Sequence, residues 1–129
     1  MNSYTPSPGD RTPDENDGFA ALVAAYLAMW NERDPRARHA LAAAVFTPDA
    51  YYVDPNSAAR GIAAIDAYVA GWQAQFPDSE FTRGALHGHH HVVYFEWSFG
   101  SPGNPPAGNG RDVAVVENGR ISTVYGFFQ

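Results

Sequence analysis

The hydrophobic period of this chain changes from helical to extended along its length, and that change constrains the fold more than any other feature. Large apolar residues recur at helical spacing up to residue 75. Beyond residue 79 the chain is rich in β-branched and aromatic residues and reads as successive strands. Helices grouped first and strands grouped last favour an α+β fold over a doubly wound parallel sheet.

Three helices are predicted in the first part of the chain. The first spans residues 18–33, with Asp17 as its N-cap; the second starts after Asp34, with Pro35 in its first position, and stops near Phe46. The third spans residues 62–75 and ends before Pro77. The apolar stripe of the first helix is Phe19, Leu22, Val23, Tyr26, Leu27 and Trp30.

Five strands are predicted around a set of polar connections. Residues 49–55 form a short strand that Pro55 ends, and residues 56–61 form a loop. The remaining strands span residues 79–86, 89–99, 111–117 and 120–128. Asn118-Gly119 is a strong two-residue hairpin signal, whereas residues 100–110 form a long loop of Gly, Pro and Asn.

Composition narrows the class of protein. The 129 residues suit one domain, which we place at residues 18–129 after a disordered tail at residues 1–17. All eight basic residues are arginines and the net charge is −6, so nucleic acid is not expected as a partner. The chain has no cysteine, no apolar run long enough for a membrane helix and no signal-peptide pattern. We therefore expect a cytoplasmic protein without membrane contact.

Four stretches of sequence carry a resemblance to a known family. They are Ala25–Asp34 (AYLAMWNERD), Phe46–Pro55 (FTPDAYYVDP), Arg60–Ile65 (RGIAAI) and Asp112–Phe128. Together they resemble the nuclear-transport-factor-2-like superfamily, which includes ketosteroid isomerases and SnoaL-like polyketide cyclases. The resemblance implies a cone-shaped barrel, in which three N-terminal helices pack on the concave face of a curved, mostly antiparallel sheet.

The resemblance also implies a catalytic trio of Asp54, Tyr26 and Asp112. In ketosteroid isomerases, which are a worked example of carboxyl tuning, equivalent residues are the general base, a phenol donor and a protonated carboxyl donor. On the sequence alone, Tyr26 lies on an apolar helix stripe, and Asp112 shares a strand face with Ala114 and Val116. Each residue also has an ordinary structural interpretation: a core tyrosine, a turn aspartate before a proline, and an exposed carboxylate.

The expected function is that of a small-molecule pocket. We predict a cofactor-independent isomerase, cyclase or lyase that transfers protons on a small hydrophobic carbonyl compound; the alternative is a non-catalytic binding or dimerisation module. No cofactor or metal is assigned, and the resemblance implies a homodimer formed through the outer face of the sheet. The residues expected to line the pocket are Trp30, Phe46, Tyr52, Tyr68, Trp72, His89, His91 and Val116.

A histidine cluster leaves a third possibility open. His87, His89 and His91 alternate, so on one continuous strand they would point to the same face and two of them could hold a metal ion. Gly88 interrupts the strand and no histidine follows His91. The cluster equally fits a polar strand end at the rim of the pocket, with one histidine acting as an acid or base.

Overall fold

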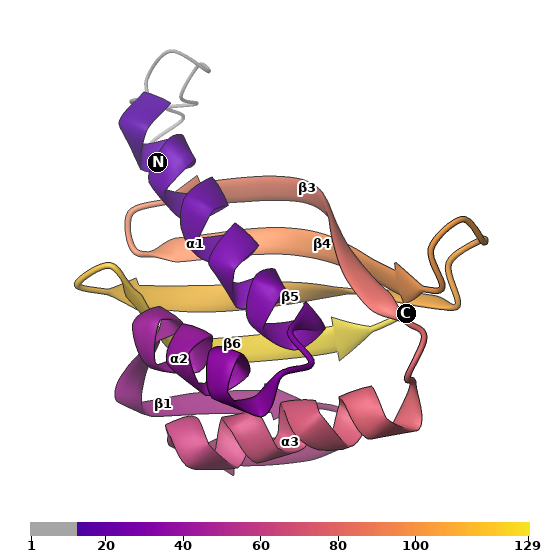
Figure 1. Ribbon diagram of the computed structural model, residues 1–129. Helices are drawn as coiled ribbons and strands as arrows, with labels where there is room; N and C mark the ends of the chain where they lie inside the picture. The colour runs from indigo at the N-terminus through magenta and orange to yellow at the C-terminus, as the bar shows by residue number, and fades with distance from the viewer. Residues whose placement is uncertain (1–12) are drawn as a thin grey trace.

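A computed structural model of the protein describes residues 13–129, and side chains from residue 18. Three helices lie over one face of a six-stranded sheet (Figure 1). The helices are α1 (Pro13–Asn31), α2 (Pro35–Val45) and α3 (Ile62–Gln75). The strands are β1 (Phe46–Asp54), β2 (Ser57–Arg60), β3 (Glu80–His89), β4 (Val92–Gly100), β5 (Gly108–Glu117) and β6 (Arg120–Phe128). The predicted α+β class, with helices on the concave face of a curved sheet, is confirmed.

The sheet has the strand order β2-β1-β6-β5-β4-β3 and is open at both edges. Within residues 13–129 the β1–β6 pair is parallel, and the other four strand pairs are antiparallel. The parallel pair brings the end of β1 beside the end of β6, with Val53 opposite Tyr125. This pairing puts the first and last strands of the chain side by side in the interior of the sheet.

The helix predictions are largely confirmed. Asp34 caps α2, since its Oδ2 accepts the backbone N–H of Ala37 at 2.9 Å, and Pro35 is the first helical residue. The bounds of α3 agree with the prediction. However, α1 begins at Pro13, so Asp17 lies inside the helix and the N-cap prediction is wrong. The expected tail falls partly on this helix, and residues 1–12 lie outside the described part of the chain.

Two strand predictions are wrong. Residues 57–60 were expected in a loop but pair with β1 as a short antiparallel strand. Residues 89–99 were expected as one strand, whereas the chain turns at His90 and His91 between β3 and β4. The Asn118-Gly119 turn is confirmed, with positive φ angles of 52° and 79°.

A buried polar network holds α1 against α3. The Arg38 guanidinium contacts the Asp66 carboxylate at 2.6 Å and donates to Gln73 Oε1 at 2.8 Å. The Gln73 amide in turn donates to the carbonyls of Trp30 and Glu32 at the end of α1. Every polar group in this chain of bonds has a partner, which burial requires. The network therefore sets the position of the aromatic residues of α1 relative to those of α3.

Candidate active site

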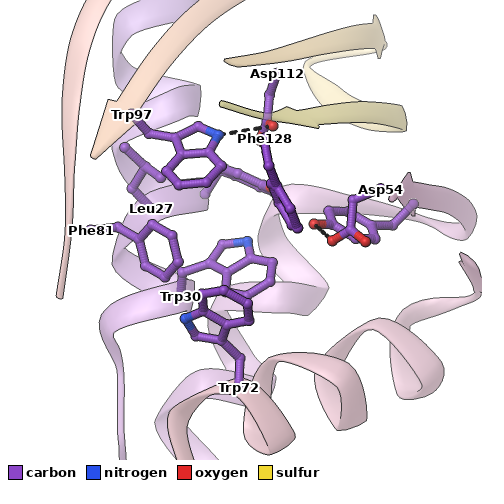
Figure 2. Close-up of a pocket in the computed structure, with 10 residues that line it drawn as sticks. Leu27, Trp30, Asp54, Trp72, Phe81, Trp97, Asp112 and Phe128 are labelled. Atoms are coloured by element: carbon purple, nitrogen blue, oxygen red, sulfur yellow. Dashed lines mark hydrogen bonds between the residues drawn. The ribbon is translucent and has the colours of Figure 1, made fainter. Parts of the chain in front are cut away.

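A pocket opens between the helices and the concave face of the sheet (Figure 2). Its walls are mostly aromatic, and two carboxyl groups, Asp54 and Asp112, face it from β1 and β5. The space open to the centre of a water molecule is about 20 Å³, enough for one water and little more. The lining residues are Tyr26, Leu27, Trp30, Tyr52, Asp54, Trp72, Phe81, Trp97, Asp112 and Phe128.

Asp112 lies on the inward face of β5 and is only 4% exposed. The indole N–H of Trp97 donates to its Oδ1 at 3.0 Å, and the phenol of Tyr26 donates to its Oδ2 at 3.3 Å. Burial raises the pKa of Asp112 to about 7, although both hydrogen bonds lower it; the nearby Asp54 charge adds to the rise. This carboxyl group therefore exists in both protonation states near neutral pH, as a proton-transfer group requires.

Tyr26 is the second hydrogen-bond donor to the Asp112 carboxyl group. It comes from the middle of α1, is 1% exposed and packs edge-on against the rings of Phe46 and Phe95. Burial, followed by the Asp112 charge, raises the pKa of Tyr26 well above its usual value. The phenol therefore remains protonated and acts as a hydrogen-bond donor at physiological pH.

Asp54 has a different environment at the end of β1. Its Oδ2 accepts the phenols of Tyr52 and Tyr68 at 2.6 and 2.8 Å. Its Oδ1 accepts the backbone N–H groups of Asn56 and Ser57 at 2.8 and 3.0 Å, which shapes the turn into β2. Four donors occupy the roughly four acceptor positions of a carboxylate. Asp54 is thus held firmly in place: one oxygen shapes the turn into β2, and the side chain also lines the pocket.

Trp72 adds an unsatisfied donor to the pocket wall. Its indole Nε1 is buried and finds no acceptor among the residues that the structure describes. Buried indole N–H groups usually have a partner.

The structure brings together only some of the residues expected around the pocket. Tyr26, Asp54 and Asp112 all line it, as do Trp30, Tyr52 and Trp72. Tyr68 reaches it through its bond to Asp54, whereas Phe46 packs behind the Tyr26 ring. Val116 does not line the pocket; it lies four residues beyond Asp112 on β5 and packs against the core. Sequence reasoning missed Trp97, the partner of Asp112, although its parity with Phe95 would have pointed it inward.

The histidine cluster lies away from this site. His89 and His91 are exposed and do not line the pocket, because the chain reverses at His90–His91 and leaves them at the tip of the β3–β4 hairpin. The alternation expected for His87, His89 and His91 therefore does not extend along one strand. Within residues 13–129 no group of three or more His, Cys, Asp or Glu residues is arranged to hold a metal ion. In the same range, no helix is long and apolar enough to cross a bilayer.

The helix-covered curved sheet and its acidic, aromatic-lined pocket define a protein of the nuclear-transport-factor-2-like class. The SnoaL-like domain family matches residues 23–124. The chain belongs to this family.

Solved structures of similar proteins support the same assignment. A SnoaL-like family protein from Agrobacterium tumefaciens, for which an isomerase activity is suggested, is 30% identical, with 88% of this chain and 98% of that chain covered and a TM-score of 0.83. A suggested SnoaL-like polyketide cyclase from Jannaschia sp. CCS1 is 17% identical over 93% and 90% of the two chains, with a TM-score of 0.74. A suggested ketosteroid isomerase from Kribbella flavida is 19% identical over 88% and 78%, with a TM-score of 0.67. No curated protein matches the sequence.

Proposed function

We propose that this protein is a cofactor-independent isomerase, cyclase or lyase that moves a proton on a small hydrophobic carbonyl compound. The observation that carries the proposal is the pairing of Asp112, whose pKa lies near 7, with the protonated phenol of Tyr26 inside an aromatic pocket. A base and a donor side by side suit the two ends of an enolisation. The suggested isomerase and cyclase activities of similar proteins are consistent with this chemistry.

Asp112 is better suited than Asp54 to carry the proton. From the described part of the chain two donors contact Asp112, one of them at 3.3 Å, whereas four donors contact Asp54. Ionised Asp112 takes the proton from the carbon next to the substrate carbonyl, and Tyr26 donates a hydrogen bond to the resulting enolate oxygen. Asp112 then returns the proton to another carbon in an isomerisation. In a cyclisation the enolate carbon attacks a second carbonyl, whose π electrons move to its oxygen, and Asp112 returns the proton to the resulting alkoxide. Asp54 and Tyr52 supply a polar part of the pocket wall, and the hydrogen bond between them holds it in place.

Deuterium exchange tests this role without knowledge of the product. Cyclic ketones are incubated with the protein in D₂O, and loss of the proton signal next to the carbonyl is followed by NMR. The wild type should accelerate exchange, and Asp112→Asn should abolish the acceleration, because an amide cannot accept the proton. Asp49→Asn, an exposed aspartate on β1, is the matched control and should exchange at the wild-type rate. Exchange by Asp112→Asn at the wild-type rate would refute the proton role, and binding of a ketone without any exchange would support the non-catalytic binding module.

We also propose that the protein forms a homodimer through the outer face of its sheet. Tyr125 and Phe127 project from that face of β6 with 44% and 56% exposure. On the neighbouring strand β5, the cross-strand partner of Tyr125 is Val113, which is half-buried, and that of Phe127 is Arg111. The face thus combines apolar side chains with charge, and a two-fold axis would pair it with itself. Light scattering should give the dimer mass for the wild type and the monomer mass for a Tyr125→Ser/Phe127→Ser variant; a monomeric wild type would refute the proposal.

A further inference from the structure

The side chain of Asn31 binds the backbone of strand β3 as a neighbouring strand would. Asn31 is the last residue of α1; its amide N–H donates to the Phe81 carbonyl oxygen at 2.9 Å, and its carbonyl oxygen accepts the Phe81 N–H at 2.7 Å. An amide side chain offers a donor and an acceptor side by side, as a peptide group does. We call this pair of hydrogen bonds the Asn31 anchor.

The bound segment of β3 needs such an anchor, because β3 lies at the edge of the sheet and is irregular. The β3–β4 register shifts between Arg83 and Leu86, and β3 curves toward the end of α3 at its start (Figure 1). A strand bends at such a bulge, and backbone groups on an open edge find no partner in the sheet. The Asn31 anchor thus holds the bent start of β3 against the end of α1.

Phe81 connects this anchor to the pocket. Its ring lines the pocket, with its centroid 5.2 Å from that of Trp30 and 5.4 Å from that of Trp97 (Figure 2). The indole N–H of Trp97 donates to Asp112 at 3.0 Å. Asn31 is therefore linked to the Asp112 carboxyl group through the backbone of Phe81, a ring contact and the indole hydrogen bond.

Arg33, two residues further along the chain, holds a different part of the same region. Its guanidinium donates to the carbonyl oxygens of Gln73, Phe76 and Ser79 at 2.6–3.1 Å. These three residues do not line the pocket. Arg33 thus holds the connection between α3 and β3, whereas Asn31 holds a residue of the pocket wall.

We propose that Asn31 is a positioning residue for the candidate active site: by fixing Phe81, it keeps the Trp97 indole on Asp112 and keeps water away from that carboxyl group. Asn31 does not line the pocket itself, so it acts through Phe81. Without the anchor the start of β3 moves away from α1, and solvent reaches the indole N–H. This inference rests on the proposed function for its catalytic purpose, but its main experiment uses no ketone.

Asn31→Leu tests the anchor, because leucine has a similar shape and no polar group. The Trp97 indole proton of this variant should exchange with D₂O at least about tenfold faster than that of the wild type, since two hydrogen bonds that close the wall are lost. Asp34→Ala is the matched control: it removes the cap of α2, which also costs stability, and Asp34 does not line the pocket. Its indole proton should exchange close to the wild-type rate. A wild-type rate in Asn31→Leu, or equal acceleration in the two variants, would overturn the proposal.

A double variant tests whether Asn31 acts through Phe81. Phe81→Leu removes the ring and should by itself accelerate exchange of the indole proton. The combined Asn31→Leu/Phe81→Leu variant should exchange at the rate of Phe81→Leu, because the ring that Asn31 positions is already absent. Accelerations that multiply in the double variant would refute the assignment.

A smaller change keeps the proposal falsifiable if Asn31→Leu does not fold. Asn31→Asp retains an acceptor for the Phe81 N–H and lacks the donor to the Phe81 carbonyl oxygen. Its indole proton should exchange at least about threefold faster than that of the wild type, as expected for the loss of one hydrogen bond. A wild-type rate in this variant would contradict the anchor.

Ketone exchange separates this proposal from the proton role of Asp112. Asn31→Leu should lower kcat for ketone exchange and leave KM nearly unchanged, because Asn31 does not touch the substrate. An unchanged kcat would overturn the positioning role. Wild-type ketone exchange by Asp112→Asn, together with the expected indole results, removes the proton role alone. A wild-type indole rate in Asn31→Leu, with ketone exchange abolished in Asp112→Asn, removes the positioning role alone.

Discussion

The phenol of Tyr26 and the carboxyl group of Asp112 are 86 positions apart in the chain and meet through a 3.3 Å hydrogen bond in the interior. One comes from a helix that covers the sheet and the other from a central strand of the sheet. Among the residues that the structure describes, neither group contacts a positive charge, and burial is the largest cause of the raised pKa of Asp112. This is the environment in which a carboxyl group exchanges protons near neutral pH.

Burial of Asp112 should make the protein less stable as the pH rises. Its pKa is 3.8 when unfolded and about 7 when folded, so between these values the native state holds a proton that the unfolded state has lost. The stabilisation is complete below about pH 4 and is lost as the pH passes 7, an effect on the order of 4 kcal/mol if the full shift is expressed. Urea unfolding at several pH values should therefore show Asp112→Asn gaining stability relative to the wild type from pH 4 to pH 8. A constant difference between the two proteins would contradict the raised pKa.

The rate of ketone exchange should follow the ionisation of Asp112. Because the base must be deprotonated, kcat/KM for exchange should rise with pH and level off above the pKa of about 7. The control variant Asp49→Asn should give the same profile as the wild type. A rate that is flat from pH 5 to pH 9, or that falls as the pH rises, would argue against Asp112 as the base.

The two tyrosines on Asp54 should contribute unequally to stability. Tyr52 is buried and its phenol is 2.6 Å from the carboxylate, whereas Tyr68 is only half-buried. Tyr52→Phe should cost about 1–3 kcal/mol, because no water can replace the lost donor beside a buried anion. Tyr68→Phe should cost less, since solvent reaches that side. Denaturant unfolding of the two variants compares these costs, and an equal or larger loss in Tyr68→Phe would show that burial does not govern them.

Gly110→Ala should disrupt the strand pairing next to the pocket. Gly110 lies between Trp97 and Phe128 across the sheet, and a Cβ there would lie 2.3 Å from the Phe127 carbonyl oxygen and 2.4 Å from the Trp97 ring. Since the carbonyl belongs to the sheet backbone, only a distortion of β6 or a displaced indole relieves the clash. We expect a loss of about 3 kcal/mol, the upper end of the typical cost of the off-rotamer side chains and backbone shifts that overpacking forces. Thermal melting checks this, with Gly71→Ala as control; a melting temperature equal to that of the control would contradict the clash.

Much of the fold is encoded in local signals that the sequence displays directly. The third helix is bounded by Gly61 and the residues before Pro77, and the last hairpin by Asn118-Gly119; both agree with the structure. Strand β2 escaped notice because Ser57–Arg60 has no strand-forming composition. Its pairing depends on the Asp54 carboxylate, which binds the Asn56 and Ser57 amides and reverses the chain. The turn at His90–His91 could not be predicted either, because it contains neither glycine nor asparagine.

Only part of the candidate site could be predicted from the sequence, for a related reason. Tyr26, Asp54 and Asp112 stand out as polar groups at apolar or strand-end positions. Trp97 and Gly126 can be recognised as neighbours of Asp112 only when the strand register is known. Asp112 pairs with Phe95 on one side and with Gly126 on the other. Register follows from the turn positions, and an error of two residues at the β3–β4 turn moves every partner along the strand.

The side chain of Asp54 determines two properties of the protein. One of its oxygens shapes the Pro55–Asn56 reversal and the other anchors two phenols at the pocket. In the course of divergence, replacement of this residue would therefore alter loop shape and site polarity at once. Adaptation to a new substrate is freer at the aromatic walls, so we expect descendants of this sequence to vary there while Asp54 and its turn stay the same.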